Sequence, residues 1–204
     1  MQHSPIIALD GDGVLLDYNL AYASAWERAF GVVPRERDPK AYWAMDRWEV
    51  EALQGTRLER FRGSLDESFW ESIPAMPGAL EACHALKAAG YTLVCVTALA
   101  DRFGEARLRN LQSLGFPIDR VITTGNVGHG KSPKAQALEA LKPVAFVDDF
   151  LPYLLGIEAD MHLALILRDE NGSPNVGEDL HKVDSTHGSL LEFSRWWLNA
   201  PCQF

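Results

Sequence analysis

The stretch that decides the fold is IIALDGDG, residues 6–13. Four successive apolar residues predict a short strand that is buried on both faces, as the strands of a parallel sheet are. The Asp-Gly-Asp-Gly sequence that follows predicts a tight, glycine-rich turn. We therefore expect a buried parallel strand with two carboxylates, Asp10 and Asp12, directly after its end.

The same pattern of short apolar runs recurs along the chain. Strands are predicted at 91–96, 144–147 and 162–167, with a weaker candidate at 120–124. The segments between them carry apolar residues at helical spacing and end at glycines. Strands that alternate with helices predict an α/β fold with a doubly wound, mostly parallel sheet.

One long segment breaks this alternation. Residues 17–76 contain several helix-like runs and no convincing buried strand. We interpret them as an inserted helical module, and predict a discontinuous core domain of residues 1–16 and 77–204. Residues 168–182 contain Gly and Pro and predict a surface loop, whereas 190–198 predict a closing helix packed on the sheet.

The composition excludes several classes of protein. Lys and Arg number 19 against 28 Asp and Glu, and the net charge of −9 argues against a nucleic-acid or anionic-membrane partner. The cysteines are far apart in the sequence, which favours neither a disulfide framework nor a zinc site and fits a reducing compartment. We recognise no signal peptide and no apolar run of about 20 residues, and expect a cytoplasmic protein with a small-molecule partner.

Polar residues that can carry chemistry follow several of the predicted strands. They are Asp10 and Asp12 after the first strand, Thr97 after the second, Asp148 and Asp149 after the strand at 144–147, and Lys131 and Lys134 near the start of a helix. Open parallel sheets form their ligand sites at the carboxyl ends of the strands, so we expect these residues to share one site. Crowded carboxylates repel one another unless a cation is bound, and Mg²⁺ is the usual cation where the substrate carries phosphate.

Four motifs, in this order, resemble those of the haloacid dehalogenase superfamily of aspartate-nucleophile phosphotransferases. They are DGDGVL at 10–15, VCVT at 94–97, GKSPK at 130–134 and FVDD at 146–149. The segment PGAL at 77–80 is similar to the family's lead-in to its second motif, and the inserted helices lie where many members carry a helical cap. The resemblance covers the whole chain and implies a Rossmann-like core with such a cap.

The resemblance also implies roles for individual residues. Asp10 would attack a phosphoryl group and form an aspartyl-phosphate, which divides one difficult displacement into two easier ones. Asp12 would protonate the departing alkoxide and then accept a proton from the attacking water. Thr97 and one lysine would hold the phosphoryl oxygens, and this lysine is either Lys131 or Lys134.

The same resemblance implies a magnesium site. Mg²⁺ would be held by Asp10, by the backbone carbonyl of Asp12, and by Asp148 or Asp149. Asp148 stands at the strand end, where a direct ligand is expected, whereas Asp149 would bind the metal or orient the lysine. The choice between the two residues stays open at this point.

Candidate substrate-binding residues lie in two places. Thr97 and its neighbour Ala98 follow the second strand, and the insertion contributes Trp43 and Arg47. Aromatic residues of a helical module more often pack in its core, and the periodicity does not fix which of them face a pocket.

The residue at position 12 narrows the expected reaction. Dehalogenating relatives lack an acid there and the family's transport ATPases carry threonine, so Asp12 implies a phosphatase or a phosphomutase. We predict a Mg²⁺-dependent phosphatase that hydrolyses a small soluble phosphomonoester. The alternatives are a sugar phosphomutase, in which the phosphoryl group passes to substrate instead of water, and a non-catalytic module that binds a phosphorylated ligand.

Overall fold

A computed structural model describes residues 4–125, 132–157 and 160–199. Six strands form one sheet in the order β3-β2-β1-β4-β5-β6, and every neighbouring pair is parallel. The strands are β1 (Ile6–Leu9), β2 (Thr92–Thr97), β3 (Arg120–Thr123), β4 (Ala145–Asp148), β5 (His162–Ile166) and β6 (Ser185–His187). The sequence prediction of a doubly wound parallel sheet is confirmed.

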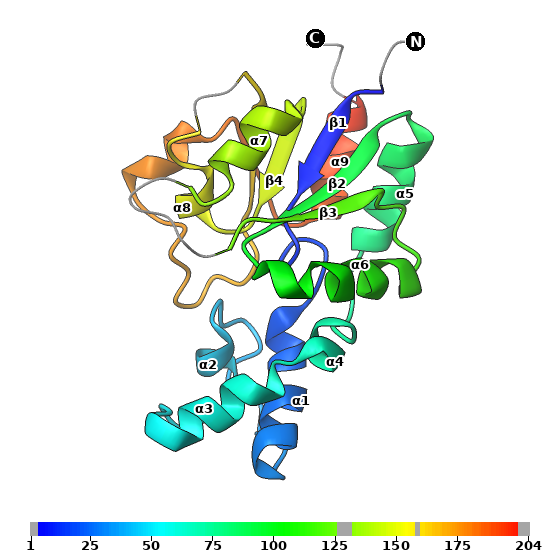
Figure 1. The fold of residues 1–204 in the computed structure, drawn as a ribbon. Helices are drawn as coiled ribbons and strands as arrows, with labels where there is room; N and C mark the ends of the chain where they lie inside the picture. The colour runs from blue at the N-terminus through cyan, green and yellow to red at the C-terminus, as the bar shows by residue number, and fades with distance from the viewer. Residues whose placement is uncertain (1–3, 126–131, 158–159, 200–204) are drawn as a thin grey trace.

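Helices cover both faces of this sheet (Figure 1). They are α5 (Ala79–Ala88), α6 (Gly104–Ser113), α7 (Ala135–Leu141), α8 (Leu151–Leu154) and α9 (Leu190–Asn199), with short 3-10 helices at Asp101–Phe103 and Glu178–Lys182. None of the helices in the described ranges is long and apolar enough to cross a membrane.

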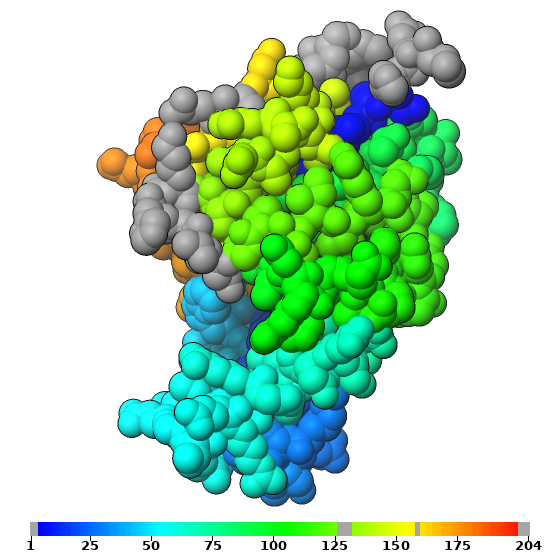
Figure 2. Space-filling model, viewed as in Figure 1, coloured from blue at the N-terminus to red at the C-terminus, as the bar shows by residue number. Residues whose placement is uncertain are grey.

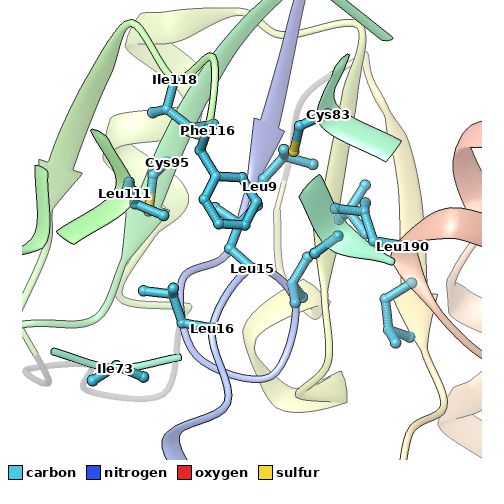
Figure 3. Packing of buried hydrophobic residues seen from close by; sticks show 14 of the residues in the cluster. Leu9, Leu15, Leu16, Ile73, Cys83, Cys95, Leu111, Phe116, Ile118 and Leu190 are labelled. Carbon is cyan, nitrogen blue, oxygen red and sulfur yellow. The ribbon is translucent and has the colours of Figure 1, made fainter. Parts of the chain in front are cut away.

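The side chains of β1 alternate between the two faces of the sheet, and the hydrophobic core is accordingly divided into two clusters. Ile7 and Leu9 belong to one hydrophobic cluster, and Ala8 between them belongs to the other, because successive side chains of a strand point to opposite faces. Figure 3 shows part of the first cluster, in which Leu9 lies among side chains such as Cys83 of α5 and Leu190 of α9. Both faces are buried, which explains why β1 is a continuous apolar run.

The inserted segment 17–76 is helical, as predicted. It holds α1 (Tyr18–Phe30), α2 (Ala44–Arg47), α3 (Gly55–Ser64) and α4 (Glu67–Trp70), which lie beyond the carboxyl ends of the strands (Figure 1). Figure 2 shows the blue and cyan atoms of this segment as a lobe below the core. The chain leaves and returns through paired linkers, in which Asp17 N donates to Pro74 O at 2.8 Å and Met76 N donates to Leu15 O at 2.9 Å. The division into two domains at these linkers stays a prediction.

Two predictions concern the C-terminal part of the chain. The closing helix is confirmed as α9, which packs against α5 and β6. The prediction of a surface loop at 168–182 is wrong in part, because Glu178–Lys182 forms a 3-10 helix. The sequence analysis also missed β6, since Ser185–His187 is a three-residue polar strand with no apolar pattern to reveal it.

The packing of α9 generates a matched test of stability. Leu190 is 3% exposed and Leu198 is 38% exposed on the same helix. We expect Leu190→Ala to lower the free energy of unfolding by about 2–5 kcal/mol, because it leaves a cavity in the core. Leu198→Ala should change it by less than about 0.5 kcal/mol. Urea unfolding followed by tryptophan fluorescence measures both, and equal losses would contradict the docking of α9.

Two histidines on β5 and β6 generate a pH prediction. Nε2 of His162 and Nε2 of His187 lie 2.8 and 2.9 Å from the Ser185 hydroxyl, and burial lowers the pKa of both rings. In the unfolded chain, histidine titrates near its ordinary pKa of about 6.5. The two rings therefore bind protons more readily in the unfolded chain than in the folded chain. We therefore expect the contribution of these two histidines to the free energy of unfolding to fall as the pH decreases below about 7.

The measurement is denaturant unfolding between pH 5 and 8. Relative to the unaltered chain, His187→Gln should become more stable as the pH falls from 8 to 5, whereas His181→Gln, at an exposed position on the 3-10 helix, serves as the control. The same dependence of stability on pH in His187→Gln and in the unaltered chain would count against this assignment.

Candidate active site

The structure brings three carboxylates together at the centre of the sheet. Asp10 follows β1, and Asp148 ends the neighbouring strand β4. The path of the chain across the sheet reverses between these two strands, at the point where open parallel sheets place their ligand sites. One carboxylate oxygen from each of Asp10, Asp148 and Asp149 lies within 4.8 Å of the others, and all three residues are buried.

Lys134 connects two of these carboxylates. Its side chain is completely buried, and its Nζ lies 2.5 Å from Asp10 Oδ1 and 2.7 Å from Asp148 Oδ2. Burial alone would lower the pKa of Lys134, but the two carboxylates more than reverse this effect and raise it. Lys134 therefore holds a positive charge at the site. The alternative lysine, Lys131, lies outside the described residues.

The carboxylates still repel one another despite this lysine. Burial raises the pKa of Asp148 to about 7, against the opposing effect of Lys134 and with further contributions from Asp10 and Asp149. Burial likewise raises the pKa of Asp149. A divalent cation would relieve this repulsion, and buried carboxylate oxygens are the ligands that hard cations prefer. The three residues therefore fit a divalent-cation site, to which both Asp148 and Asp149 offer an oxygen.

Asp149 is held in place by a residue that the sequence analysis did not single out. Arg168 Nε donates to Asp149 Oδ2 at 2.6 Å, and the arginine side chain is only 13% exposed. Gly13 packs against the same carboxylate, at a φ of +88° and so close that a Cβ there would lie 2.3 Å from Asp149 Oδ2. Arg168 comes two residues after Ile166, the last residue of β5, so the strand-end rule applied to β5 would have found it.

Asp12 lies outside the carboxylate cluster and pairs with a buried arginine. Nη2 of Arg107, a fully buried residue on α6, lies 2.8 Å from Asp12 Oδ1 and 3.0 Å from Oδ2, and only the second contact has hydrogen-bond geometry. Burial raises the pKa of Asp12, and Arg107 opposes this rise. The guanidinium lies 5.2 Å from the centre of the Trp70 ring on α4. Arg107 was missed because nothing in its local sequence distinguishes it.

A pocket of about 830 Å³ opens over these residues, between the sheet and the inserted helices. Thr97 and Ala98 line it, as does Trp43 from the insertion, so the structure brings these predicted residues to one cavity with Asp10 and Asp12. Arg47 is not among the residues that line the pocket, and its role in binding substrate stays a prediction. Its Nε instead donates to Glu36 Oε1 at 2.8 Å within the inserted segment.

Comparison with known proteins agrees with this geometry. A family model described as haloacid dehalogenase-like hydrolase matches residues 5–158. No curated relative matches the chain in sequence.

Several solved structures share the fold over nearly the whole chain. A putative beta-phosphoglucomutase from Thermotoga maritima has a TM-score of 0.64 at 19% identity and covers 97% of this chain and 100% of its own. A HAD family hydrolase from Deinococcus radiodurans R1, solved with bound phosphate and sodium, has a TM-score of 0.65 at 16% identity and covers 96% and 95%.

An L-2-haloacid dehalogenase from Xanthobacter autotrophicus has a TM-score of 0.61 at 16% identity and covers 97% and 100%. At such identities the three structures establish a shared fold. The family model matches well over half of the 204 residues. The chain therefore belongs to the haloacid dehalogenase-like hydrolases.

Proposed function

We propose that this protein is a Mg²⁺-dependent phosphatase that hydrolyses a small phosphomonoester through an aspartyl-phosphate. The observation that carries the proposal is the shared pocket of Asp10 and Asp12. Both residues line it, and Asp12 Oδ1 has no hydrogen-bond partner among the described residues. A buried nucleophile and a separate proton donor beside one cavity are the two groups that such a hydrolysis requires.

The cation would be held by Asp10, Asp148 and Asp149, with the predicted contribution of the Asp12 carbonyl. When bound, Mg²⁺ would offset the negative charge that gathers on the transferring phosphoryl group. Lys134 adds a second positive charge beside Asp10.

Two steps follow for the chain's own residues. An Asp10 oxygen attacks phosphorus, the ester bond to the leaving oxygen breaks, and Asp12 gives its proton to that oxygen so that a neutral alcohol departs. A water molecule then attacks phosphorus, its proton passes to Asp12, and the acyl-phosphate bond breaks to release inorganic phosphate and Asp10. Thr97, which is 3% exposed and lines the pocket, would hold a phosphoryl oxygen.

Asp12 also favours phosphoryl transfer over dehalogenation, the activity named for one of the similar structures. A halide ion departs without a proton because it is a weak base, so dehalogenation needs no general acid. An alkoxide is a strong base and departs readily only when it is protonated. A carboxyl group beside the pocket therefore has a use in hydrolysing a phosphate ester and none in displacing a halide.

The nucleophile provides the direct test. Asp10→Asn should reduce the release of phosphate from p-nitrophenyl phosphate in Mg²⁺ to background, because the amide is a poor nucleophile. Asp12→Asn should reduce the release of phosphate from phenyl phosphate, whose leaving group needs more protonation, by about 10²–10⁴-fold. Chelation of the metal should abolish the release in the unaltered enzyme. Asp119→Asn, on the surface and paired with Lys87, is the matched control.

Retained turnover in Asp10→Asn would overturn the mechanism. Release of chloride from L-2-chloropropionate in place of phosphate from esters would indicate a dehalogenase. Conversion of a hexose 1-phosphate to the 6-phosphate, without free phosphate, would indicate a mutase.

Arg107 is expected to position the general acid. It forms no ion pair with another described carboxylate, and its Nη2 lies 2.8 Å from Oδ1 and 3.0 Å from Oδ2 of Asp12. Arg107→Met should lower kcat for phenyl phosphate by about 10²-fold, because misplacement of a catalytic group by about 1 Å has an effect of this size. The loss should be smaller for p-nitrophenyl phosphate, whose leaving group needs less protonation.

The comparison of the two esters separates positioning from a structural role. Arg107→Lys, which keeps the charge, should recover part of kcat. Arg109→Met is the control on the same helix, since Arg109 is half-exposed and pairs with Glu67 and Glu71. Equal losses with both esters would mean that Arg107 supports only the fold.

A further inference from the structure

Aromatic rings form much of the wall of the pocket. Among the described residues, eight lining side chains are aromatic. These are Tyr18, Tyr22, Tyr42, Trp43, Trp70, Phe103, Phe150 and Tyr153. A phosphoryl group held at Asp10 would project its leaving group into this ring-lined space.

The first group of rings runs from the inserted helices to the core. The ring centre of Trp43 lies 4.8 Å from that of Tyr42 and 6.1 Å from that of Phe150, which in turn lies 4.7 Å from Tyr153. All three pairs meet edge to face, the arrangement that aromatic quadrupoles favour. Trp43 remains 46% exposed, so part of its ring is open to a ligand.

The second group also joins the two parts of the chain. Trp70 of α4 stacks on Tyr18 of α1 at 6.1 Å and lies 5.8 Å from Phe103 of the core. Figure 1 shows α2 and α4 on different sides of α1. A leaving group in this pocket would therefore meet rings contributed from two directions.

The described part of the pocket wall offers no spare positive charge for a second anionic group. Among the described lining residues, Arg168 is the only cation. It is already bound to Asp149 at 2.6 Å and to Asp169 at 2.8 Å, and it lies over the Tyr42 ring. An additional carboxylate or phosphate on the substrate would lose its water without gaining a partner, which is unfavourable.

Asp17 and Asp46, two further carboxylates that line the pocket, also lie close to positively charged groups. Asp17 accepts a hydrogen bond from the backbone N–H of Leu20 and lies 3.9 Å from Arg47. Asp46 lies 3.8 Å from Arg37. With both signs of charge already paired, this part of the pocket favours a neutral group over a cationic one.

We propose that the preferred substrate is a phosphomonoester whose leaving group carries a neutral aromatic ring and no second anionic group. This inference rests on the proposed phosphatase function. The ring would occupy the space beside Trp43 and make edge or stacked contacts with the wall. The bond that breaks and the proton that moves are those of the two steps given above, and the leaving group departs as a neutral aromatic alcohol or phenol.

The test compares phosphorylated compounds whose leaving groups differ in the presence of a ring and in charge. Benzyl phosphate should be hydrolysed with a kcat/KM at least 10-fold higher than 4-carboxybenzyl phosphate, which adds one carboxylate to the same ring. The kcat/KM for benzyl phosphate should also exceed the values for butyl phosphate and phosphocholine. Both of these compounds lack a ring, and phosphocholine also adds a positive charge. Acetyl phosphate, too small to reach the rings, is the reference substrate.

A substitution in the wall identifies the ring contact. Trp43→Ala should lower the ratio of kcat/KM for benzyl phosphate to that for acetyl phosphate by about 3- to 10-fold, and Trp43→Phe should restore most of it. Trp196→Ala is the matched control, because Trp196 is 41% exposed and does not line the pocket. The ratio of the two kcat/KM values in Trp196→Ala should equal the ratio in the unaltered enzyme.

Binding of a non-hydrolysable analogue separates this inference from the function on which it rests. Calorimetry in Mg²⁺ should show tighter binding of benzylphosphonate than of 4-carboxybenzylphosphonate. Selective binding without turnover of any ester would contradict the phosphatase and support the ring preference. Equal or better turnover of the carboxylated, cationic or aliphatic esters, or an unchanged ratio in Trp43→Ala, would overturn the ring preference.

Discussion

Repulsion among carboxylates held at one point of the sheet is the constraint on which the site depends. β1 and β4 are parallel neighbours whose register pairs Leu9 with Val147, so Asp10 and Asp148 emerge side by side. A shift of one residue would turn each side chain to the opposite face and separate the two carboxylates. The buried apolar runs that fix this register therefore also fix the cluster, and the cluster in turn requires positive charge around it.

That charge comes from three separate parts of the chain. Lys134 precedes α7 and neutralises Asp10 and Asp148, Arg168 follows β5 and holds Asp149, and Arg107 on α6 holds Asp12. Each cation is committed to a carboxylate of the site. This pairing offsets the repulsion among the buried carboxylates, and it leaves no unpaired cation among the described residues that line the pocket.

The inserted segment contacts both the hydrophobic core and the charged residues of the site. One hydrophobic cluster extends from β1 to Tyr22 and Trp26 of α1, so the insertion is packed continuously with the core. Tyr42 donates from its hydroxyl to the backbone carbonyl of Asp149 at 3.0 Å, and Trp70 lies over Arg107. The segment that contributes rings to the pocket wall therefore also contacts Asp149 of the carboxylate cluster and Arg107, the partner of Asp12.

The sequence by itself determined the parallel sheet, the helical insertion and the carboxylates at the strand ends, because apolar periodicity and the residue after a strand are local properties of the chain. The tertiary structure alone decided which charges pair. Arg107 reaches Asp12 across 95 positions of sequence, and Arg47, predicted to bind substrate, turns to Glu36. Such pairings depend on how helices pack on the sheet, and no periodicity within a single segment encodes the distance between two of them.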